Sequence, residues 1–220
     1  MKCLDCKLAK RTFLYGIVTL IVVIFSYNFL DVKVANLIHT SDFFGTAIST
    51  AAALTSQIFS PKIWAIITAV VTLICIYKHL TKKPSEKLYI MSLTLIMTIL
   101  ITTIVKVILA RYRPEMLLFD NKYGFHFLSF KKAYNSMPSG HTALTFAGLL
   151  AIANFFDKKF ITIIALAICC FVAVSRIIIL DHFISDVIVA AYIGIFTYLW
   201  SKAFVENKRS NKNQFIYSLK

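Results

Sequence analysis

Six long apolar segments constrain the fold of this 220-residue chain more than any other feature of its sequence. They lie at roughly residues 12–30, 62–79, 88–109, 138–156, 160–179 and 183–201. Each approaches the length of about 20 residues with which an α-helix crosses a bilayer core of about 30 Å. With 59% hydrophobic residues, the chain also carries more apolar material than one water-exposed domain of this size can bury. The sequence therefore predicts an integral membrane protein.

The six segments are expected to cross the membrane as helices. Lipid offers no partner for backbone N–H and C=O groups, and apolar runs of this length satisfy them within a helix rather than in the short alternating strands of a barrel. We therefore expect an all-α fold, a bundle of six transmembrane helices. Residues 1–205 would form this single domain, and residues 206–220 a solvated, frayed basic tail.

Residues 43–59 form a further apolar stretch that is interrupted by regular Ser and Thr residues. Because this stretch is shorter and more polar than the six spans, we expect an amphipathic helix that lies on the outer face of the membrane. The alternative is a packed helix that only caps the bundle. A true additional span would reverse the orientation of every later segment.

Basic residues between the apolar segments predict the orientation of the spans. They gather in the gaps that six crossings place on one side of the membrane: Lys2, Lys7, Lys10, Arg11, Lys78, Lys82, Lys83, Lys87, Lys158, Lys159, Lys202, Lys208, Arg209, Lys212 and Lys220. Such loops stay in the cytoplasm, so both termini are expected there. The same clustering accounts for the formal charge of +14, and no nucleic-acid partner is expected.

Polar residues interrupt the apolar pattern at the outer ends of three spans. The first group is Lys106-x6-Arg113-Pro114, at the end of the third span. Seven residues are close to two helical turns, so the two cations are expected on one helical face. The structural alternative is a pair of side chains that snorkel to the interface. Lys106, however, lies inside the apolar run and needs a partner.

The second group, Pro138-Ser139-Gly140-His141, opens the fourth span. Free backbone N–H groups at a helix start, beside a glycine that allows close approach, form a seat for phosphate oxygens. A plain helix start with an interfacial histidine is the alternative.

The third group ends the fifth span with Arg176 and opens the sixth with His182 and Asp186. On a helix, the i, i+4 spacing places the Asp186 carboxylate one turn from the imidazole, where it can hold one ring nitrogen while the other faces a substrate. Asp181 is expected to point about 100° away from His182 and to take no part. A structural ion pair at a helix bend is the alternative.

Together the three groups indicate phosphate chemistry. Lys106, Arg113 and Arg176 would neutralise a phosphate dianion but repel a metal ion. We therefore expect no metal and no cofactor. These cations, together with Ser139 and the Gly140 amide, are expected to bind the phosphate oxygens in the transition state.

In-line phosphoryl transfer also needs a nucleophile and a proton donor beside the leaving oxygen. His182, oriented by Asp186, is the predicted nucleophile. His141 is the predicted general acid for the departing alcohol and the base when water attacks the phosphohistidine. The remaining histidines, His39, His79 and His126, are expected to have no catalytic role.

The segments Lys-x6-Arg-Pro at 106–114, Pro-Ser-Gly-His at 138–141 and Ser-Arg-x5-His-x3-Asp at 175–186 resemble the three-part signature of the type 2 phosphatidic acid phosphatases. This superfamily is shared with the vanadium haloperoxidases. The resemblance implies a metal-independent lipid phosphatase with an outward-facing site, and the same roles for the residues named above. We therefore expect hydrolysis of a phosphate monoester on an outer-leaflet phospholipid or glycolipid.

The fragments Arg111-Tyr-Arg-Pro-Glu-Met, Tyr123-Gly-Phe and His182-Phe-Ile-Ser-Asp resemble bacterial lipid A phosphatases. Lipid A, reached from a bacterial inner membrane, is therefore the first candidate substrate. Undecaprenyl diphosphate and phosphatidylglycerol phosphate remain open. So do a lipid phosphotransferase and a lipid transporter or binding protein. An oxidase-like site that holds vanadate is disfavoured, because that chemistry gains nothing from six membrane spans.

The loop at residues 110–137 joins two of the three groups and is the expected lid or specificity loop. Its lysines, Lys122, Lys131 and Lys132, are candidates to meet a second phosphate or a sugar head group.

Overall fold

The computed structural model describes residues 3–41 and 46–218, and most of these residues are helical, as predicted. The elements are α1 (Cys3–Phe29), α2 (Asp31–Thr40), α3 (Ala47–Ile58), α4 (Pro61–Leu80), α5 (Glu86–Leu109), α6 (Pro114–Asp120), the 3-10 turn η1 (Lys132–Tyr134), α7 (Gly140–Phe156), α8 (Lys159–Ile178) and α9 (Ile184–Ser218). In the described ranges the only strand-like pairing is an isolated antiparallel bridge between Arg111 and Phe125.

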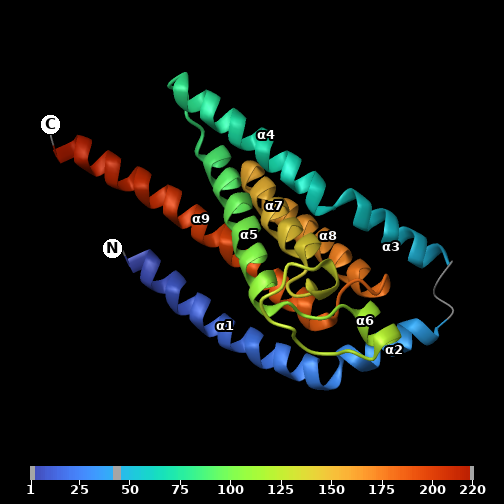
Figure 1. Cartoon of the computed structure of the whole chain (residues 1–220). Coiled ribbons are helices and arrows are strands. Elements are labelled where there is room, and N and C mark those ends of the chain that lie inside the picture. Colours follow the sequence, from blue (N-terminus) through green and yellow to red (C-terminus); the bar gives the residue numbers. More distant parts are fainter. Residues whose placement is uncertain (1–2, 42–45, 219–220) are drawn as a thin grey trace.

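Helix α7 forms the centre of the bundle and packs against α5, α8 and α9 (Figure 1). Helix α9 also contacts α5 and α1, while α4 packs on α5 and α3 on α8. The start of α1 and the end of α9 lie at one end of the bundle, and α6 and the connection from α8 to α9 lie at the opposite end (Figure 1). We call this second end the site end.

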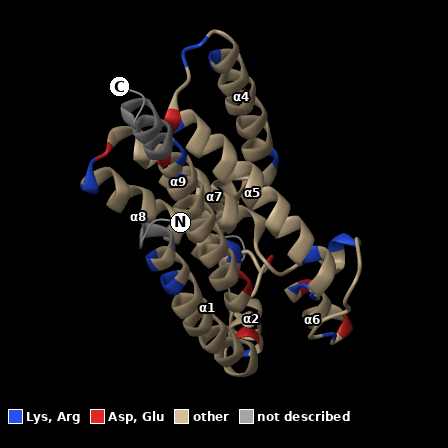
Figure 2. Cartoon of the chain, turned by 90° about the vertical axis from the view of Figure 1, so that its left-hand side faces the viewer, with Lys and Arg blue, Asp and Glu red and all other residues tan. Residues whose placement is uncertain are grey.

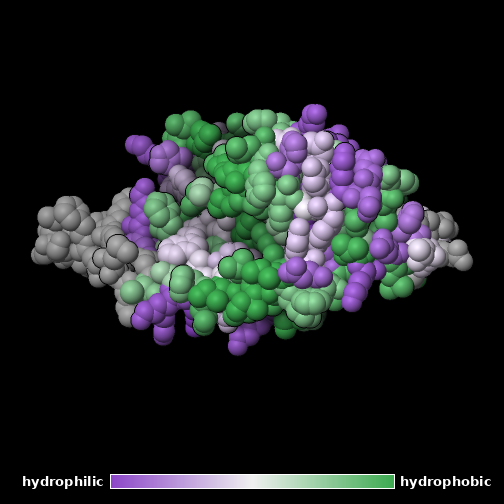
Figure 3. Space-filling model, turned by 60° about the horizontal axis from the view of Figure 1, so that its bottom comes forward, coloured by the Kyte–Doolittle hydropathy of each residue, from purple (hydrophilic) through white to green (hydrophobic). Residues whose placement is uncertain are grey.

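The lengths of the helices agree with the six predicted spans. Five helical stretches are long and apolar enough to cross a membrane: Cys6–Phe29, Ala47–Leu80, Glu86–Leu109, Lys159–Ile178 and Ile184–Lys208. Helix α7 is the shorter sixth, an apolar helix of 17 residues. Large hydrophobic side chains such as Phe13, Leu73 and Phe171 are exposed on the outside of the bundle. The face in Figure 3 shows broad hydrophobic areas of this kind, which suit a lipid environment.

Charged residues largely avoid the apolar stretches of the long helices. Figure 2 shows basic positions at the connection from α4 to α5, near the start of α8 and near the start of α1, whereas the helices between them are largely uncharged. This distribution matches the clustering from which the orientation of the spans was predicted.

Two details differ from the predictions. Helix α2 was not expected, and it follows α1 after a break at Leu30. Helix α9 continues to Ser218, so the prediction of a frayed tail is wrong up to that residue.

The predicted amphipathic helix corresponds to α3, although residues 42–45 lie outside the described chain. Ser60 caps α4 and Pro61 starts it, which separates α3 from α4. The location of α3 on the membrane surface stays a prediction.

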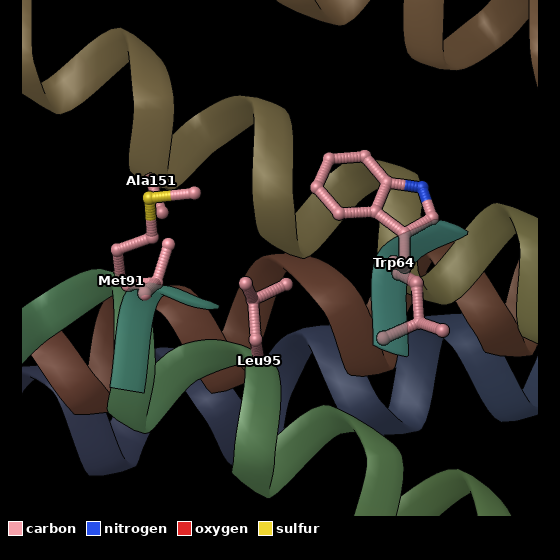
Figure 4. Close-up of a cluster of buried hydrophobic side chains, with 6 residues drawn as sticks. Trp64, Met91, Leu95 and Ala151 are labelled. Carbon is pink, nitrogen blue, oxygen red and sulfur yellow. The ribbon is translucent and has the colours of Figure 1, made fainter. Parts of the chain in front are cut away.

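A tryptophan joins α4 to the centre of the bundle. Trp64 packs with Met91 and Leu95 of α5 and Ala151 of α7 (Figure 4). Its indole Nε1 donates to Thr145 Oγ1 at 3.3 Å, which satisfies the polar atom in this apolar cluster.

Helices α7 and α9 approach closely at Gly194, and this contact predicts a stability effect. A Cβ at residue 194 would lie 2.5 Å from the backbone carbonyl oxygen of Ala143, so α7 would have to move. We expect Gly194→Ala to lower the free energy of unfolding by about 1–3 kcal/mol. Thermal unfolding in detergent measures the effect.

Gly16→Ala is the matched control, because the nearest atom to a Cβ at residue 16 is the Tyr192 hydroxyl at 3.0 Å, at the far end of a side chain. Equal unfolding temperatures for the two variants would contradict the close helix contact.

Candidate active site

The three polar groups of the sequence meet in a cavity of about 320 Å³ at the site end of the bundle. Five predicted site residues line it: Lys106, Arg113, Gly140, His141 and His182. Arg176 reaches the same place through an ion pair with the lining residue Asp181. Asp186 stands behind His182. Residues far apart in the chain are thus brought together by the packing of α5, α7, α8 and α9.

His182 lies in the turn between α8 and α9 and is 3% exposed. Its Nδ1 faces Asp186 Oδ2 at 3.7 Å, slightly too far for a hydrogen bond. Burial, together with the charges of Lys106 and Arg113, lowers the pKa of His182 to about 3, although Asp186 acts in the opposite direction. The imidazole is therefore neutral near pH 7 and keeps the lone pair that a nucleophile needs.

Asp186 lies in the first turn of α9 and is held by several donors. Its Oδ2 accepts from the Phe183 backbone N–H at 2.8 Å and from Ser136 Oγ at 2.5 Å. The predicted helical i, i+4 geometry is only partly right, because α9 begins at Ile184 and His182 precedes it. Asp186 nevertheless faces the imidazole, as expected.

His141 lies in the first turn of α7, opposite a hydroxyl that the sequence did not single out. Its Nε2 is 3.5 Å from Ser56 Oγ of α3. Ser56 Oγ also accepts a hydrogen bond from Arg176. Helix α3 therefore does more than cap the bundle, since it contributes a polar contact to the site.

Lys106 and Arg113 line the same cavity but do not share a helical face. Helix α5 ends at Leu109, and Ala110 takes a left-handed conformation with φ 42°. The prediction of one shared face is therefore wrong. The two side chains converge because Lys106 Nζ donates to the Asn135 carbonyl at 2.7 Å and Arg113 Nε to the Lys132 carbonyl at 3.0 Å, and both carbonyls belong to the loop 110–137.

The two predicted phosphate ligands at the start of α7, Gly140 and Ser139, lie in different places. Gly140 lines the cavity, and a Cβ there would lie 3.5 Å from Pro61 Cγ. The buried Ser139 hydroxyl caps α7 and accepts from the Thr142 backbone N–H at 3.5 Å. Ser139 is not among the residues that line the cavity, so its contact with phosphate stays a prediction.

The side chain of Asp181 does not point in the direction that the sequence predicted. Residues 179–183 form a turn rather than a helix, so the expected direction of this side chain, away from His182, is wrong. The Asp181 carboxylate lines the cavity and forms ion pairs with both Arg113 and Arg176. It also lies 3.9 Å from His182 Nε2.

A buried ion-pair network supports the site from behind, and the sequence did not reveal it. Arg111 is fully buried; its Nη1 donates to Asp186 Oδ1 at 2.6 Å and its Nη2 to Asp31 Oδ2 at 2.7 Å. Ser185, next to Asp186 in the chain, also binds Asp31: its backbone N–H donates to Asp31 Oδ1 at 3.1 Å. The two carboxylates hold the pKa of Arg111 above its ordinary value, against the effect of burial.

Aromatic rings enclose the Arg111 guanidinium. Phe183 and Tyr27 have ring centroids 4.5 and 5.1 Å from its central carbon, and Tyr123 and Phe125 lie slightly further away. The available signals in the sequence were an arginine inside the first motif and a carboxylate directly after the first span. Neither signal indicates by itself that the two residues meet.

Two imidazoles and a carboxylate also lie close enough to resemble a metal site. The ligand atoms of His141, Asp181 and His182 are all within 4.8 Å of one another. The Asp181 oxygens, however, already pair with Arg113 and Arg176, and a metal ion would have to compete with both cations. The charge balance of the site therefore suits an anion better than a metal ion.

The helical bundle and its cationic pocket beside His182 are those of a membrane protein that suits an anionic group. The model of the PAP2 superfamily matches residues 87–210, and the chain belongs to that superfamily. This match confirms the resemblance seen in the three motifs. No curated protein sequence matches the chain significantly.

Two solved structures have a similar fold. One is a transmembrane PAP2 type phosphatidylglycerolphosphate phosphatase from Bacillus subtilis, with 18% identity, a TM-score of 0.65, and coverage of 90% of this chain and 95% of that chain. The other is LpxE from Aquifex aeolicus, with 22% identity, a TM-score of 0.52, and coverage of 78% of this chain and 94% of that chain.

The Arg111 network predicts a stability effect. Arg111→Met leaves two carboxylates buried without their cation, and we expect a loss of about 3–5 kcal/mol in the free energy of unfolding. Denaturant unfolding in detergent measures it. Arg11→Met is the matched control, since Arg11 is exposed at the other end of the bundle. A loss no larger than that of the control would contradict the role of the network.

Proposed function

We propose that this protein is a membrane lipid phosphatase that hydrolyses a phosphate monoester through a phosphohistidine on His182. The observation that carries the proposal is the buried His182 imidazole, which faces Asp186 on one side and the cavity on the other. Membership of the PAP2 superfamily supports the same chemistry. A site that only binds phosphate has no need for an imidazole oriented in this way.

In the proposed first step, His182 Nε2 attacks phosphorus and the bond from phosphorus to the lipid oxygen breaks. His141 takes up a proton from solvent as the phosphate dianion binds and donates it to the departing oxygen. Asp186 stabilises the proton on Nδ1 of His182 as positive charge develops on the ring. Lys106, Arg113 and Arg176 hold the equatorial oxygens, where the charge of the transition state gathers.

In the second step, water attacks the phosphohistidine and His141 accepts the proton of that water. The bond from phosphorus to nitrogen breaks, its electron pair returns to His182, and inorganic phosphate leaves. An alcohol in place of water would give a phosphotransferase with the same residues. No step needs a metal ion.

The cavity also suits a lipid substrate. Besides the charged groups, its wall includes Ala65 of α4, Ile99 of α5 and Leu144 of α7, so apolar surface lies beside the phosphate seat. Lys132 lines the cavity as well, whereas Lys122 and Lys131 are not among the lining residues. Lys132 is therefore the loop lysine best placed to meet a second polar group of the substrate.

Lipid A remains our first candidate substrate, and the similarity in fold to LpxE is compatible with it. The similarity in fold to a phosphatidylglycerolphosphate phosphatase supports phosphatidylglycerol phosphate equally well. Undecaprenyl diphosphate, whose terminal phosphoryl group is held by an anhydride instead of an ester bond, is the third candidate. We further propose that the site end faces the outside of a bacterial inner membrane and that both termini are cytoplasmic, as the basic loops indicate.

Substitution of the nucleophile tests the proposal. We expect the wild-type protein to release phosphate from at least one of four purified lipids: lipid A, phosphatidylglycerol phosphate, phosphatidic acid and undecaprenyl diphosphate. His182→Ala should lower the rate at least about 10⁴-fold, because the covalent step is lost. A phosphate assay on detergent-solubilised protein measures both.

His39→Ala is the matched control for this substitution, since His39 is exposed in α2 and lies away from the cavity. Retained activity in His182→Ala would refute the phosphohistidine. Binding of these lipids without release of phosphate by the wild type would favour the alternative of a lipid transporter or binding protein.

Chelation tests the proposed independence of metal. EDTA should leave phosphate release unchanged, because three cations and not a metal ion hold the phosphate oxygens. The same assay with and without EDTA, followed by added divalent cations, measures this. Loss of activity that a divalent metal restores would show that His141, Asp181 and His182 bind a metal ion.

A further inference from the structure

The cations of the site already have an anionic partner from the chain itself. Asp181 pairs with Arg113 through one carboxylate oxygen and with Arg176 through the other. A carboxylate bridged by two guanidinium groups resembles the way in which arginines hold two oxygens of a phosphate.

Asp181 also lies where a phosphoryl group would have to sit. Its Oδ2 is 3.9 Å from His182 Nε2, the ring nitrogen that points away from Asp186. The nearest ligand atom of His141 lies within 4.8 Å of the same carboxylate. A substrate in line with Nε2 would bring its phosphorus into this space, so the carboxylate and the phosphoryl group cannot occupy it together.

We propose that Asp181 is a built-in competitor for phosphate, which neutralises Arg113 and Arg176 in the empty site and leaves them when a phosphoryl group binds. This inference rests on the proposed function, because it assigns a regulator to the same pocket. The carboxylate sets a threshold: an incoming anion must attract the two arginines more strongly than Asp181 does.

The surroundings of Asp181 allow this movement. The residue lies in the turn 179–183, where Leu180 has a left-handed φ of 54°, and its side chain is 31% exposed. Within the described part of the chain, no backbone N–H donates to its carboxylate. Asp186 is the opposite case, since it is fully buried and held by a backbone N–H, a hydroxyl and Arg111.

Because an anion must displace Asp181, the site should prefer phosphate dianions to monoanions. A terminal phosphate monoester carries close to two negative charges near pH 7, whereas a phosphodiester head group carries one. The dianion should displace Asp181, and the monoanion should compete with it poorly. Asp181 would thus keep the abundant phosphodiester lipids of the membrane out of the site.

Removing the charge of Asp181 tests the proposal. We compare inhibition of phosphate release by inorganic phosphate in the wild type, Asp181→Asn and Asp120→Asn. Asp181→Asn should lower the inhibition constant at least about tenfold, because a like charge beside the bound anion is lost. Asp120→Asn removes the same charge from an exposed position near the end of α6 and should leave the constant unchanged.

A binding measurement accompanies the inhibition assay and does not depend on turnover. Inorganic phosphate should raise the unfolding temperature of Asp181→Asn at lower concentrations than that of the wild type. Vesicles of phosphatidylglycerol, a phosphodiester lipid, should inhibit the variant and not the wild type. Asp181→Ser, which also removes the charge, replaces Asp181→Asn if that variant does not fold.

An unchanged inhibition constant in the folded variant would overturn the proposal, because the carboxylate would then be no obstacle. A higher constant would overturn it as well and would show that Asp181 aligns the arginines. A wild type that binds phosphate but releases none from any lipid would refute the proposed function alone, since the shift in phosphate binding on removing Asp181 would still be measurable.

Discussion

The ion pair between Arg111 and Asp186 connects the predicted catalytic turn to the rest of the structure. Asp186 faces His182, and Arg111 is held in turn by Asp31 at the start of α2. One guanidinium thus joins the loop after α5, the start of α9 and the N-terminal helices. The network lies in a water-excluded place, and the position of the imidazole depends on a buried charge cluster that is costly to disturb.

The site in front of this network holds an excess of positive charge in an apolar bundle. Lys106, Arg113 and Arg176 come from three different segments, and Asp181 is the carboxylate that faces them from inside the cavity. Such a concentration of cations costs free energy without an anion, and Asp181 supplies a carboxylate to two of them. The neutral state of His182 follows from the same burial and the same cations.

The spans and the grouping of the motifs could be predicted from the sequence, because apolar length and the types of residue in each motif carry that information. The path of the chain after residue 109 could not, since a left-handed Ala110 ends α5 where the spacing of Lys106 and Arg113 suggested a continuous helix. The role of Asp181 was missed for a similar reason: its direction was deduced for a helix, and the chain forms a turn there.

The partners of Arg111 and Arg176 in distant segments could not be predicted from the sequence, for another reason. Asp31 and Ser56 lie in segments without a motif, and their importance comes only from packing against Arg111 and Arg176. Nothing local to either residue distinguishes it from an interfacial carboxylate or a helix hydroxyl. Three-dimensional contacts of this kind depend on how α1, α2 and α3 close over the bundle.

The central claim is that the phosphoryl group passes through Nε2 of His182. The most direct measurement is mass spectrometry of the peptide that contains His182, after the protein has been mixed with substrate and quenched within milliseconds in alkaline detergent, where phosphohistidine survives. We expect phosphate on Nε2 of His182 during turnover and its disappearance once the substrate is exhausted. Turnover with a phosphate on a different residue, or with none on His182 at any time before the substrate is consumed, would contradict this account.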